Sequence, residues 1–193
     1  PGGIQGYGSG DYGEDAYGIS ASGSIKLDAN GLWSLDNFGK MLVGVASQDG
    51  RLVVWDPETP NTPADVVVTA PIDNTLVIAT DEEFVMLMGG KNNPRRVKWA
   101  SRRTYTDWTP TATNSAGGFE LQTNGAIKGA CRVPGGILVL TDTDAHLVEY
   151  VGAPFYYGRR RISDETELVS AMSLFSMPFG AVWMGANSFW SYS

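Results

Sequence analysis

The feature that most constrains this chain is an Asp-Gly turn placed between two apolar runs. Residues 41–56 read MLVGVASQDGRLVVWD, with β-favouring runs on either side of Gln48-Asp49-Gly50. Asp-Gly between such runs is the strongest short-range signal for a β-hairpin. We therefore expect antiparallel strands on both sides of this turn.

The same unit recurs three more times, in residues 84–99, 137–150 and 181–190. Each copy has an apolar run, a turn rich in Gly, Asn or Asp, and a second run that includes an aromatic residue. These aromatic residues are Trp55, Trp99, Tyr150 and Trp190, which lie 44, 51 and 40 residues apart. A period of about 40 to 50 residues built from short strands is typical of propeller blades, whereas helical repeats would need long segments with helical apolar spacing. The sequence predicts an all-β fold, a partial β-propeller of about four blades of short antiparallel strands over residues 25–193.

Further strands are expected between the hairpins. They cover residues 31–35, 66–68, 76–79, 116–121 and 127–133. Residues 151–157 are expected to leave the third blade, and residues 163–174 to form either a short helix capped by Ser163 or a connecting strand. The chain starts at Pro1 and ends within an apparent strand, which we interpret as a piece of a longer polypeptide.

Residues 1–24 form a separate segment of Gly, Tyr, Ser and acidic residues. Tyr7, Tyr12 and Tyr17 are each followed by glycine and recur every five residues. This composition cannot form a packed core by itself. The segment is either a flexible tether or an extended arm whose tyrosines dock on a neighbouring subunit, because an apolar ring with a polar tip suits an interface.

Charge is distributed unevenly along the chain. Residues 1–85 hold 13 acids and 3 bases, residues 86–161 hold 5 acids and 11 bases, and residues 162–193 hold 3 acids and no base. Such charges can simply solvate strand faces and loops. Alternatively, an acidic edge of one copy meets a basic edge of the next, as in head-to-tail rings.

The bases gather in two places, residues 91–103 and residues 159–161. A basic run with tryptophan nearby can bind nucleic acid, form salt bridges between subunits or loops, or remain solvated. As candidate subunit-interface residues we take the three tyrosines of the arm together with Arg95, Arg96, Arg102, Arg103, Arg159, Arg160 and Arg161.

Catalytic and metal chemistry find little support in the sequence. The single histidine, His146, follows Asp142 and Asp144, but strand alternation is expected to split these groups between faces, and there is no second histidine to complete a metal site. Residues 47–55 resemble a glycosidase Asp-box only as a hairpin, since the glycine comes one place early and the tryptophan one place late. Cys131 is expected to be a buried strand residue. We expect no enzyme activity, no cofactor, no metal and no membrane span.

Several motifs resemble, in order and spacing, those of bacteriophage tail structural proteins of the nozzle or tail-tubular type. They are the Tyr-Gly arm, WSLDNF (33–38), PRRVKW (94–99), DWTP (107–110), AGGFEL (116–121), LTDTDAH (140–146) and GAPFYYG (152–158). The resemblance implies a structural virion protein, assembled in the host cytoplasm. In that family the propeller is part of a ring, usually sixfold, that continues the portal channel and conducts DNA.

The implied partners are copies of the chain itself, portal or adaptor proteins, other tail proteins and, non-specifically, transiting DNA. Two alternatives stay open. One is a receptor- or glycan-binding tail module, and the other is a cellular propeller scaffold of the WD40 kind, suggested by Val53-Val54-Trp55-Asp56. A propeller hydrolase would need paired carboxylates, for which Asp142 and Asp144 are the best candidates.

Overall fold

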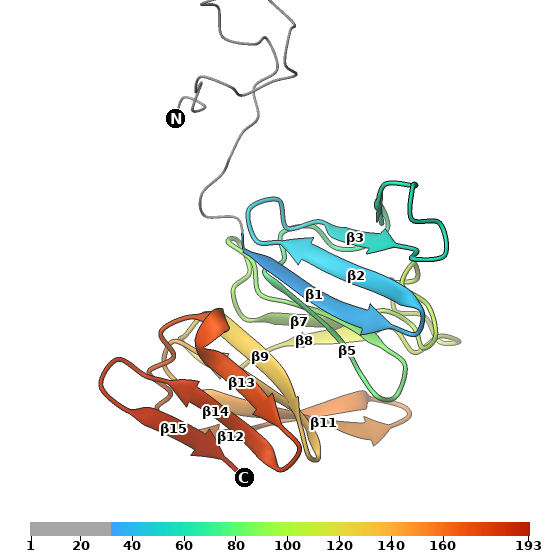
Figure 1. The fold of residues 1–193 in the computed structure, drawn as a ribbon. Helices are drawn as coiled ribbons and strands as arrows, with labels where there is room; N and C mark the ends of the chain where they lie inside the picture. Colours follow the sequence, from blue (N-terminus) through green and yellow to red (C-terminus); the bar gives the residue numbers. More distant parts are fainter. Residues whose placement is uncertain (1–31) are drawn as a thin grey trace, which may run out of the picture. The chain divides into compact units, whose positions relative to one another are not determined.

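The computed structural model describes residues 32–193, which form one compact unit of antiparallel β-sheets (Figure 1). No α-helix occurs in this range. The all-β prediction is therefore confirmed for the described residues. The expected arm, with Tyr7, Tyr12 and Tyr17, lies outside them.

The first two sheets each have four strands in sequence order. The first sheet contains β1 (Trp33–Phe38), β2 (Met41–Ala46), β3 (Leu52–Trp55) and β4 (Asp65–Val66). The second contains β5 (Leu76–Ala79), β6 (Val85–Met88), β7 (Arg96–Trp99) and β8 (Gly117–Glu120). In the β2–β3 hairpin Gly50 has a φ of 68°, the left-handed conformation that glycine adopts without steric cost, as the Asp-Gly turn predicted.

The third and fourth sheets repeat the arrangement. The third contains β9 (Ile127–Val133), β10 (Gly136–Thr141), β11 (Ala145–Gly152) and β12 (Tyr156–Ser163). The fourth contains β13 (Leu174–Met177), β14 (Gly180–Met184) and β15 (Phe189–Tyr192). All four hairpins predicted from the sequence are present, and Trp55, Trp99, Tyr150 and Trp190 each lie on the third strand of a sheet.

Two details differ from the prediction. Residues 151–157 do not leave the third unit, because β11 runs on to Gly152 and the chain returns as β12, the fourth strand of the same sheet. In residues 163–174 a 3₁₀ helix, η1 (Ala171–Ser173), is capped by Ser170 rather than Ser163, and β13 follows it directly.

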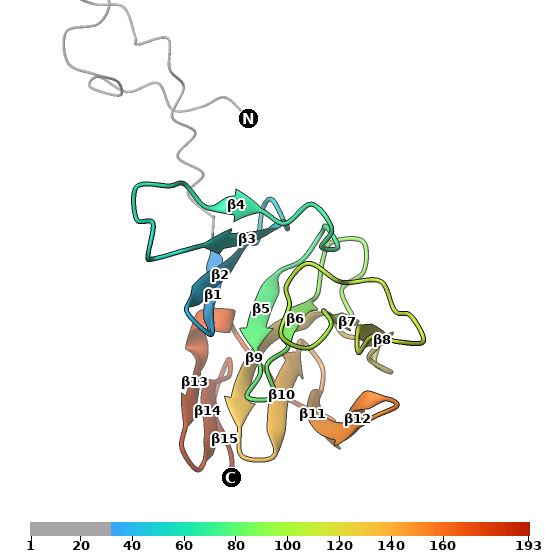
Figure 2. The ribbon, with the colours of Figure 1, turned by 90° about the vertical axis from the view of Figure 1, so that its right-hand side faces the viewer.

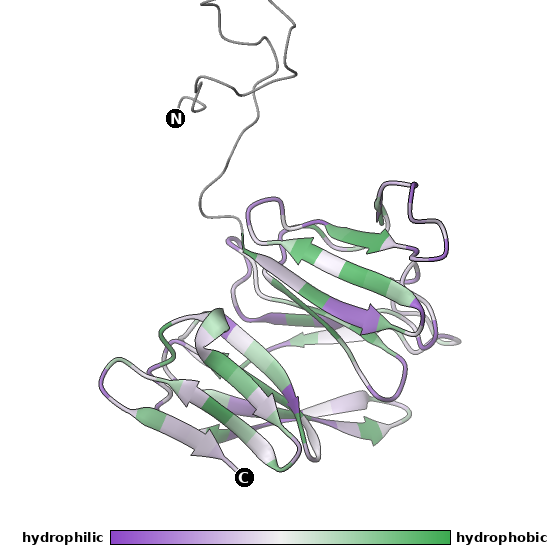
Figure 3. Cartoon of the chain, viewed as in Figure 1, coloured by the Kyte–Doolittle hydropathy of each residue, from purple (hydrophilic) through white to green (hydrophobic). Residues whose placement is uncertain are grey.

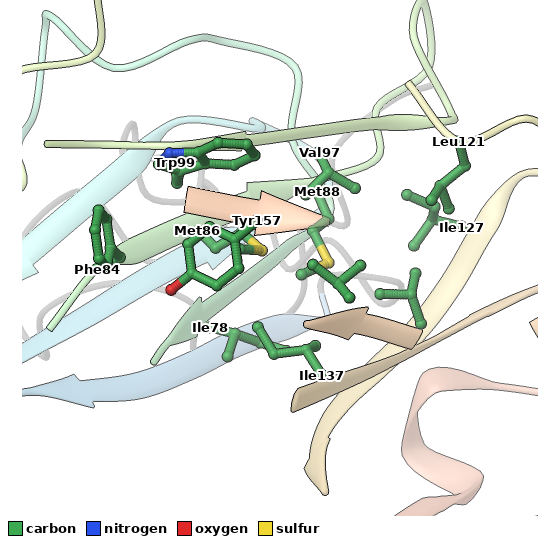
Figure 4. Close-up of a cluster of buried hydrophobic side chains, with 12 residues drawn as sticks. Ile78, Phe84, Met86, Met88, Val97, Trp99, Leu121, Ile127, Ile137 and Tyr157 are labelled. Atoms are coloured by element: carbon green, nitrogen blue, oxygen red, sulfur yellow. The ribbon is translucent and has the colours of Figure 1, made fainter. Parts of the chain in front are cut away.

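The two middle sheets are covered on both faces. Along β6, Val85 and Leu87 pack against the first sheet, while Met86 and Met88 pack against the third. Successive strand residues point to opposite faces, so one apolar run contributes to two cores. Figure 4 shows the core between the second and third sheets, where Met86 and Trp99 lie near Tyr157 of β12. Burial of side chains of this size contributes about 1.5–3 kcal/mol each.

The first strands of the four sheets lie beside one another. β1 contacts β5, β5 contacts β9 and β9 contacts β13, and Figure 2 shows the sheets spreading away from this line of strands. Side chains join the strands to neighbouring backbones. The Ala79 N–H donates to Asp36 Oδ2 at 2.8 Å, and Ser176 Oγ donates to the Arg132 carbonyl at 2.5 Å.

Arg132 of β9 reaches past β5 to the first sheet. Its guanidinium binds both carboxylate oxygens of Asp36, at 2.7 and 3.0 Å, and also donates to the Ala79 carbonyl. Flat sheets stack about 10 Å apart, so in a parallel stack the first and third sheets would be about 20 Å apart. The ion pair therefore requires the sheets to converge like wedges at their first strands.

Candidate functional site

The arginines of residues 91–103 bind groups of their own chain. Arg96 Nη2 donates to the carbonyls of Ile72 and Asp73, at 2.9 and 2.8 Å, and to Asn74 Oδ1 at 2.9 Å. Arg95 Nη1 donates to the Thr123 carbonyl at 2.9 Å. These contacts tie β7 to the loop before β5 and to the loop before β9.

Arg102 and Arg103 both bind Glu83, at 3.3 and 2.6 Å. The hydrogen bond from Arg103 is the main cause that lowers the pKa of the Glu83 carboxyl. All three side chains are substantially exposed, so these pairs contribute little to stability. Salt bridges between loops, one of the possibilities left open for this basic run, are thus present, and a role at a subunit interface stays a prediction.

The second basic spot lies on β12. Arg159 lies over the ring of Phe119, 4.7 Å from its centroid, and Arg160 binds Glu149 at 3.0 Å. Arg161 binds the buried carboxylate of Asp144 at 3.2 Å and Asp164 at 2.9 Å. Arg161 therefore neutralises a buried charge, whereas Arg159 and Arg160 make surface contacts.

Asp144 and His146 were expected to point apart, and this expectation is wrong. His146 Nε2 lies 3.2 Å from Asp144 Oδ1, because residues two apart share a face of the chain where β11 begins. Asp142 is turned away and accepts from the Ala126 N–H at 2.8 Å. Among residues 32–193 no cluster of His, Cys, Asp and Glu is arranged to hold a metal.

The Asp144 carboxylate is almost completely buried. Burial opposes its ionisation, but hydrogen bonds from the Thr141 hydroxyl at 2.5 Å and the Thr123 hydroxyl at 2.8 Å outweigh burial. Together with the neighbouring imidazole, they hold the pKa of Asp144 below its usual value. Only 1% of the Asp144 side chain and 3% of the His146 side chain are exposed, so a substrate cannot reach the pair. This geometry favours a structural role.

A pocket of about 800 Å³ opens where the first strands of the second, third and fourth sheets end. We call it the strand-end pocket. Arg132, Glu82, Tyr150 and Tyr157 contribute to its lining, with the Pro134–Gly136 turn at one side. Its polar groups could bind a polar ligand by hydrogen bonding.

Tyr157 is a buried polar residue of this pocket, and Thr80 is another. The Tyr157 hydroxyl lies 2.8 Å from Thr80 Oγ1 and donates to Glu82 Oε2 at 3.3 Å. Burial, with the nearby Glu82 carboxylate, raises the pKa of the phenol, so Tyr157 stays a neutral hydrogen-bond donor. The lining holds no histidine, cysteine or lysine within the described part of the chain. The pocket therefore offers groups that can bind a ligand by hydrogen bonding.

Large apolar side chains are also exposed on the first and last sheets. On the first sheet they include Trp33 and Leu35, which are 50% and 57% exposed. On the last sheet they include Phe175 and Phe189, which are 67% and 85% exposed. These two sheet faces and the strand-end pocket are the candidate contact surfaces considered below.

Neither a scan against protein-family models nor a search of curated proteins gives a match. No helix among residues 32–193 is long and apolar enough to cross a membrane. The resemblance to phage tail proteins therefore depends on the sequence motifs alone.

Sequence reasoning missed the strand-end pocket, the reach of Arg132 and the two exposed faces. The pocket and the ion pair had no local signal, because their members come from separate repeats. The two exposed faces did have a local signal in the sequence. Trp33 and Leu35 alternate along β1 with Ser34 and Asp36, which bind the second sheet. On the last sheet, Phe175 and Phe189 likewise occupy the strand positions that alternate with inward-facing residues.

Proposed function

We propose that this chain is a structural protein without catalytic activity, a partial β-propeller of four blades that forms part of the wall of a ring-shaped bacteriophage tail assembly. The observation that carries the proposal is the ion pair between Arg132 and Asp36, which joins the first strands of sheets one and three. Wedge-shaped packing of successive four-stranded meanders is what a propeller requires. The doubly covered middle sheets support the same geometry.

The tail assignment adds the sequence motifs to this geometry. In such a ring a rigid disc of stacked sheets would surround or flank the DNA channel, and copies of the chain, portal or adaptor proteins and other tail proteins would be its neighbours. The chain carries a net charge of −7. An acidic wall repels the phosphate backbone and lets DNA slide, while the scattered arginines limit that repulsion.

The test is electron microscopy of the purified full chain, paired with its mass in solution. Annular particles that contain several copies are expected. Replacing Arg159 and Arg160 together by glutamate should weaken assembly and leave the β-rich circular dichroism unchanged. Arg161 is left in place because it neutralises Asp144. A chain that stays monomeric at every concentration would refute the ring.

A second candidate is a receptor- or glycan-binding tail module. The strand-end pocket favours it, because Tyr150, 39% exposed, offers an aromatic surface near Glu82 and Arg132. Binding of a glycan from an array by the wild type, lost in Tyr150→Ala, would support this function. Retained binding in Tyr150→Ala would exclude the pocket as the site.

A further inference from the structure

The outer face of the last sheet is largely apolar, with Ser191 as a polar exception. Ala181 and Trp183 of β14 face the third sheet, so Val182 and Met184 point to the other side. Phe175 pairs with Val182, and Phe189 pairs with Met184, which places both phenylalanines on that same outer side. Residues 168–193 contain no charged residue at all. We call this surface the leading face.

The outer face of the first sheet is built in the same way. Val43, Val45, Leu52 and Val54 face the second sheet, so the residues between them point outward. Leu35, Gly44, Val53 and Val66 form one row across all four strands. We call this surface the trailing face.

The centre of the trailing face is a closed apolar layer. A Cβ atom on Gly44 would meet Leu35 Cδ2 at 2.8 Å, Val53 Cγ2 at 3.5 Å and the Trp33 ring at 3.6 Å. These side chains therefore converge over the glycine and cover its backbone. The three side chains and Val66 make one continuous apolar patch.

Both faces have the composition of buried surfaces. An antiparallel sheet with one face in water normally alternates apolar residues inward with polar residues outward. Here most of the outward positions are Leu, Val, Trp, Phe or Met, and Asn37 and Ser191 are polar exceptions. Contiguous exposed apolar patches of this kind mark interaction surfaces. In Figure 3 strands β2 and β3 are largely apolar in colour.

The internal interfaces indicate the partner. Each of the three cores joins two sheets that are consecutive in the sequence. One sheet contributes the face turned toward the sheet after it, which we call its later-facing side. The next sheet contributes the face turned toward the sheet before it, its earlier-facing side. The leading face is the one later-facing side left uncovered within residues 32–193, and the trailing face is the one earlier-facing side. Joining them would continue the established series of interfaces. Symmetric contacts of leading with leading or trailing with trailing faces would pair like sides, which none of the three cores does.

We propose that the leading face of one copy packs on the trailing face of a second copy of this chain, head to tail. The inference rests on the proposed propeller geometry and adds the partner and the surfaces. Such a heterologous contact repeats until the assembly closes. The first strand of the second copy, β1, would then follow β13 as β5 follows β1 within one copy.

The test uses two variants of the full chain that each spoil one face. The leading-face variant carries Phe175→Asp and Phe189→Asp, and the trailing-face variant carries Leu35→Asp. A carboxylate buried without a partner should weaken association by about 100-fold or more. Val68→Asp is the matched control, because Val68 is 89% exposed and lies on neither face. Circular dichroism and cooperative unfolding check that each variant is folded.

Sedimentation velocity and native mass spectrometry give the readout. We expect complexes for the wild type and for the control, and monomers for each face variant alone. Mixing the two variants should give a heterodimer that adds no further copies. The intact leading face of the trailing-face variant packs on the intact trailing face of the leading-face variant, and the two faces that remain free are both spoiled. This complementation is specific to a head-to-tail contact.

Three results would overturn the inference: a monomeric wild type, undiminished association of either variant alone, or no heterodimer in the mixture. A leading-face variant that still dimerises would indicate trailing-to-trailing packing instead. Annular particles that persist in both variants would refute the face contact and leave the ring proposal standing. A heterodimer from the mixture, together with a wild type that forms no ring, would support the face contact and refute the ring proposal.

Discussion

Replacing Asp36 by alanine should destabilise the chain far more than a surface charge change. Its carboxylate accepts from the Ala79 N–H and from the Asn37 N–H, each at 2.8 Å, and from the Arg132 guanidinium. Ala79 is 4% exposed, and an unsatisfied buried N–H costs about 1–3 kcal/mol. The Arg132 side chain is 45% exposed, so solvent limits the ion pair to about 1 kcal/mol. The expected loss for Asp36→Ala is about 2–4 kcal/mol.

Urea unfolding followed by tryptophan fluorescence measures this loss. Arg132→Met should cost about 1 kcal/mol, and a double-mutant cycle with Asp36→Ala should show a coupling of about 0.5–1 kcal/mol. Glu58→Ala is the control, because its 2.6 Å pair with Lys40 is 65% and 80% exposed and should contribute below about 0.5 kcal/mol.

The cycle tests the convergence of the sheets as well as their stability. A coupling near zero would mean that Asp36 and Arg132 do not meet, and the wedge-shaped arrangement would lose its main support. A loss for Asp36→Ala no larger than that of the control would refute the assignment of the buried Ala79 N–H to this carboxylate.

Three further predictions follow from single groups. Asp144→Asn should cost about 2–4 kcal/mol near neutral pH, because it removes the charge that Arg161 neutralises. Since the folded pKa of Asp144 is lowered, this difference should be complete above about pH 4 and shrink as the pH falls through the folded value; a pH-independent difference would contradict it. Burial raises the pKa of the Cys131 thiol to about 11, so alkylation at mildly basic pH should be slow until urea unfolds the chain, and fast labelling of folded protein would refute this. Gly50→Ala should cost about 1–3 kcal/mol in urea unfolding, because its φ is 68° and a Cβ would lie 2.8 Å from the Asn74 nitrogen, while Gly135→Ala, with a φ of 90° and open space around it, should cost less.

The hairpins were predictable because their information is local. Gln48-Asp49-Gly50 and the apolar runs beside it specify a turn and two strands within 16 residues, and the same holds for the other three repeats. Strand alternation also separates the two faces of β6 once the strand is known. These are properties of short segments, and short segments carry them in their own sequence.

The contacts between sheets were not predictable in the same way. Asp36 and Arg132 are 96 residues apart, and neither stands in a motif that indicates the other. His146 and Asp144 were misjudged because the strand was expected to separate them, whereas the spacing of two places them on one side. Ser163 looked like a helix cap, but the capping box forms at Ser170 and Ser173, where the chain turns into β13.

In all four sheets every strand is hydrogen-bonded only to strands that directly precede or follow it in the sequence. During synthesis, each sheet can therefore complete its backbone pairing as soon as its own last strand has left the ribosome, without waiting for later residues. Only side-chain cores must then form between one finished sheet and the next. Folding in the order of translation would keep long-range loop closure small, which favours rapid folding for a chain composed entirely of β-structure.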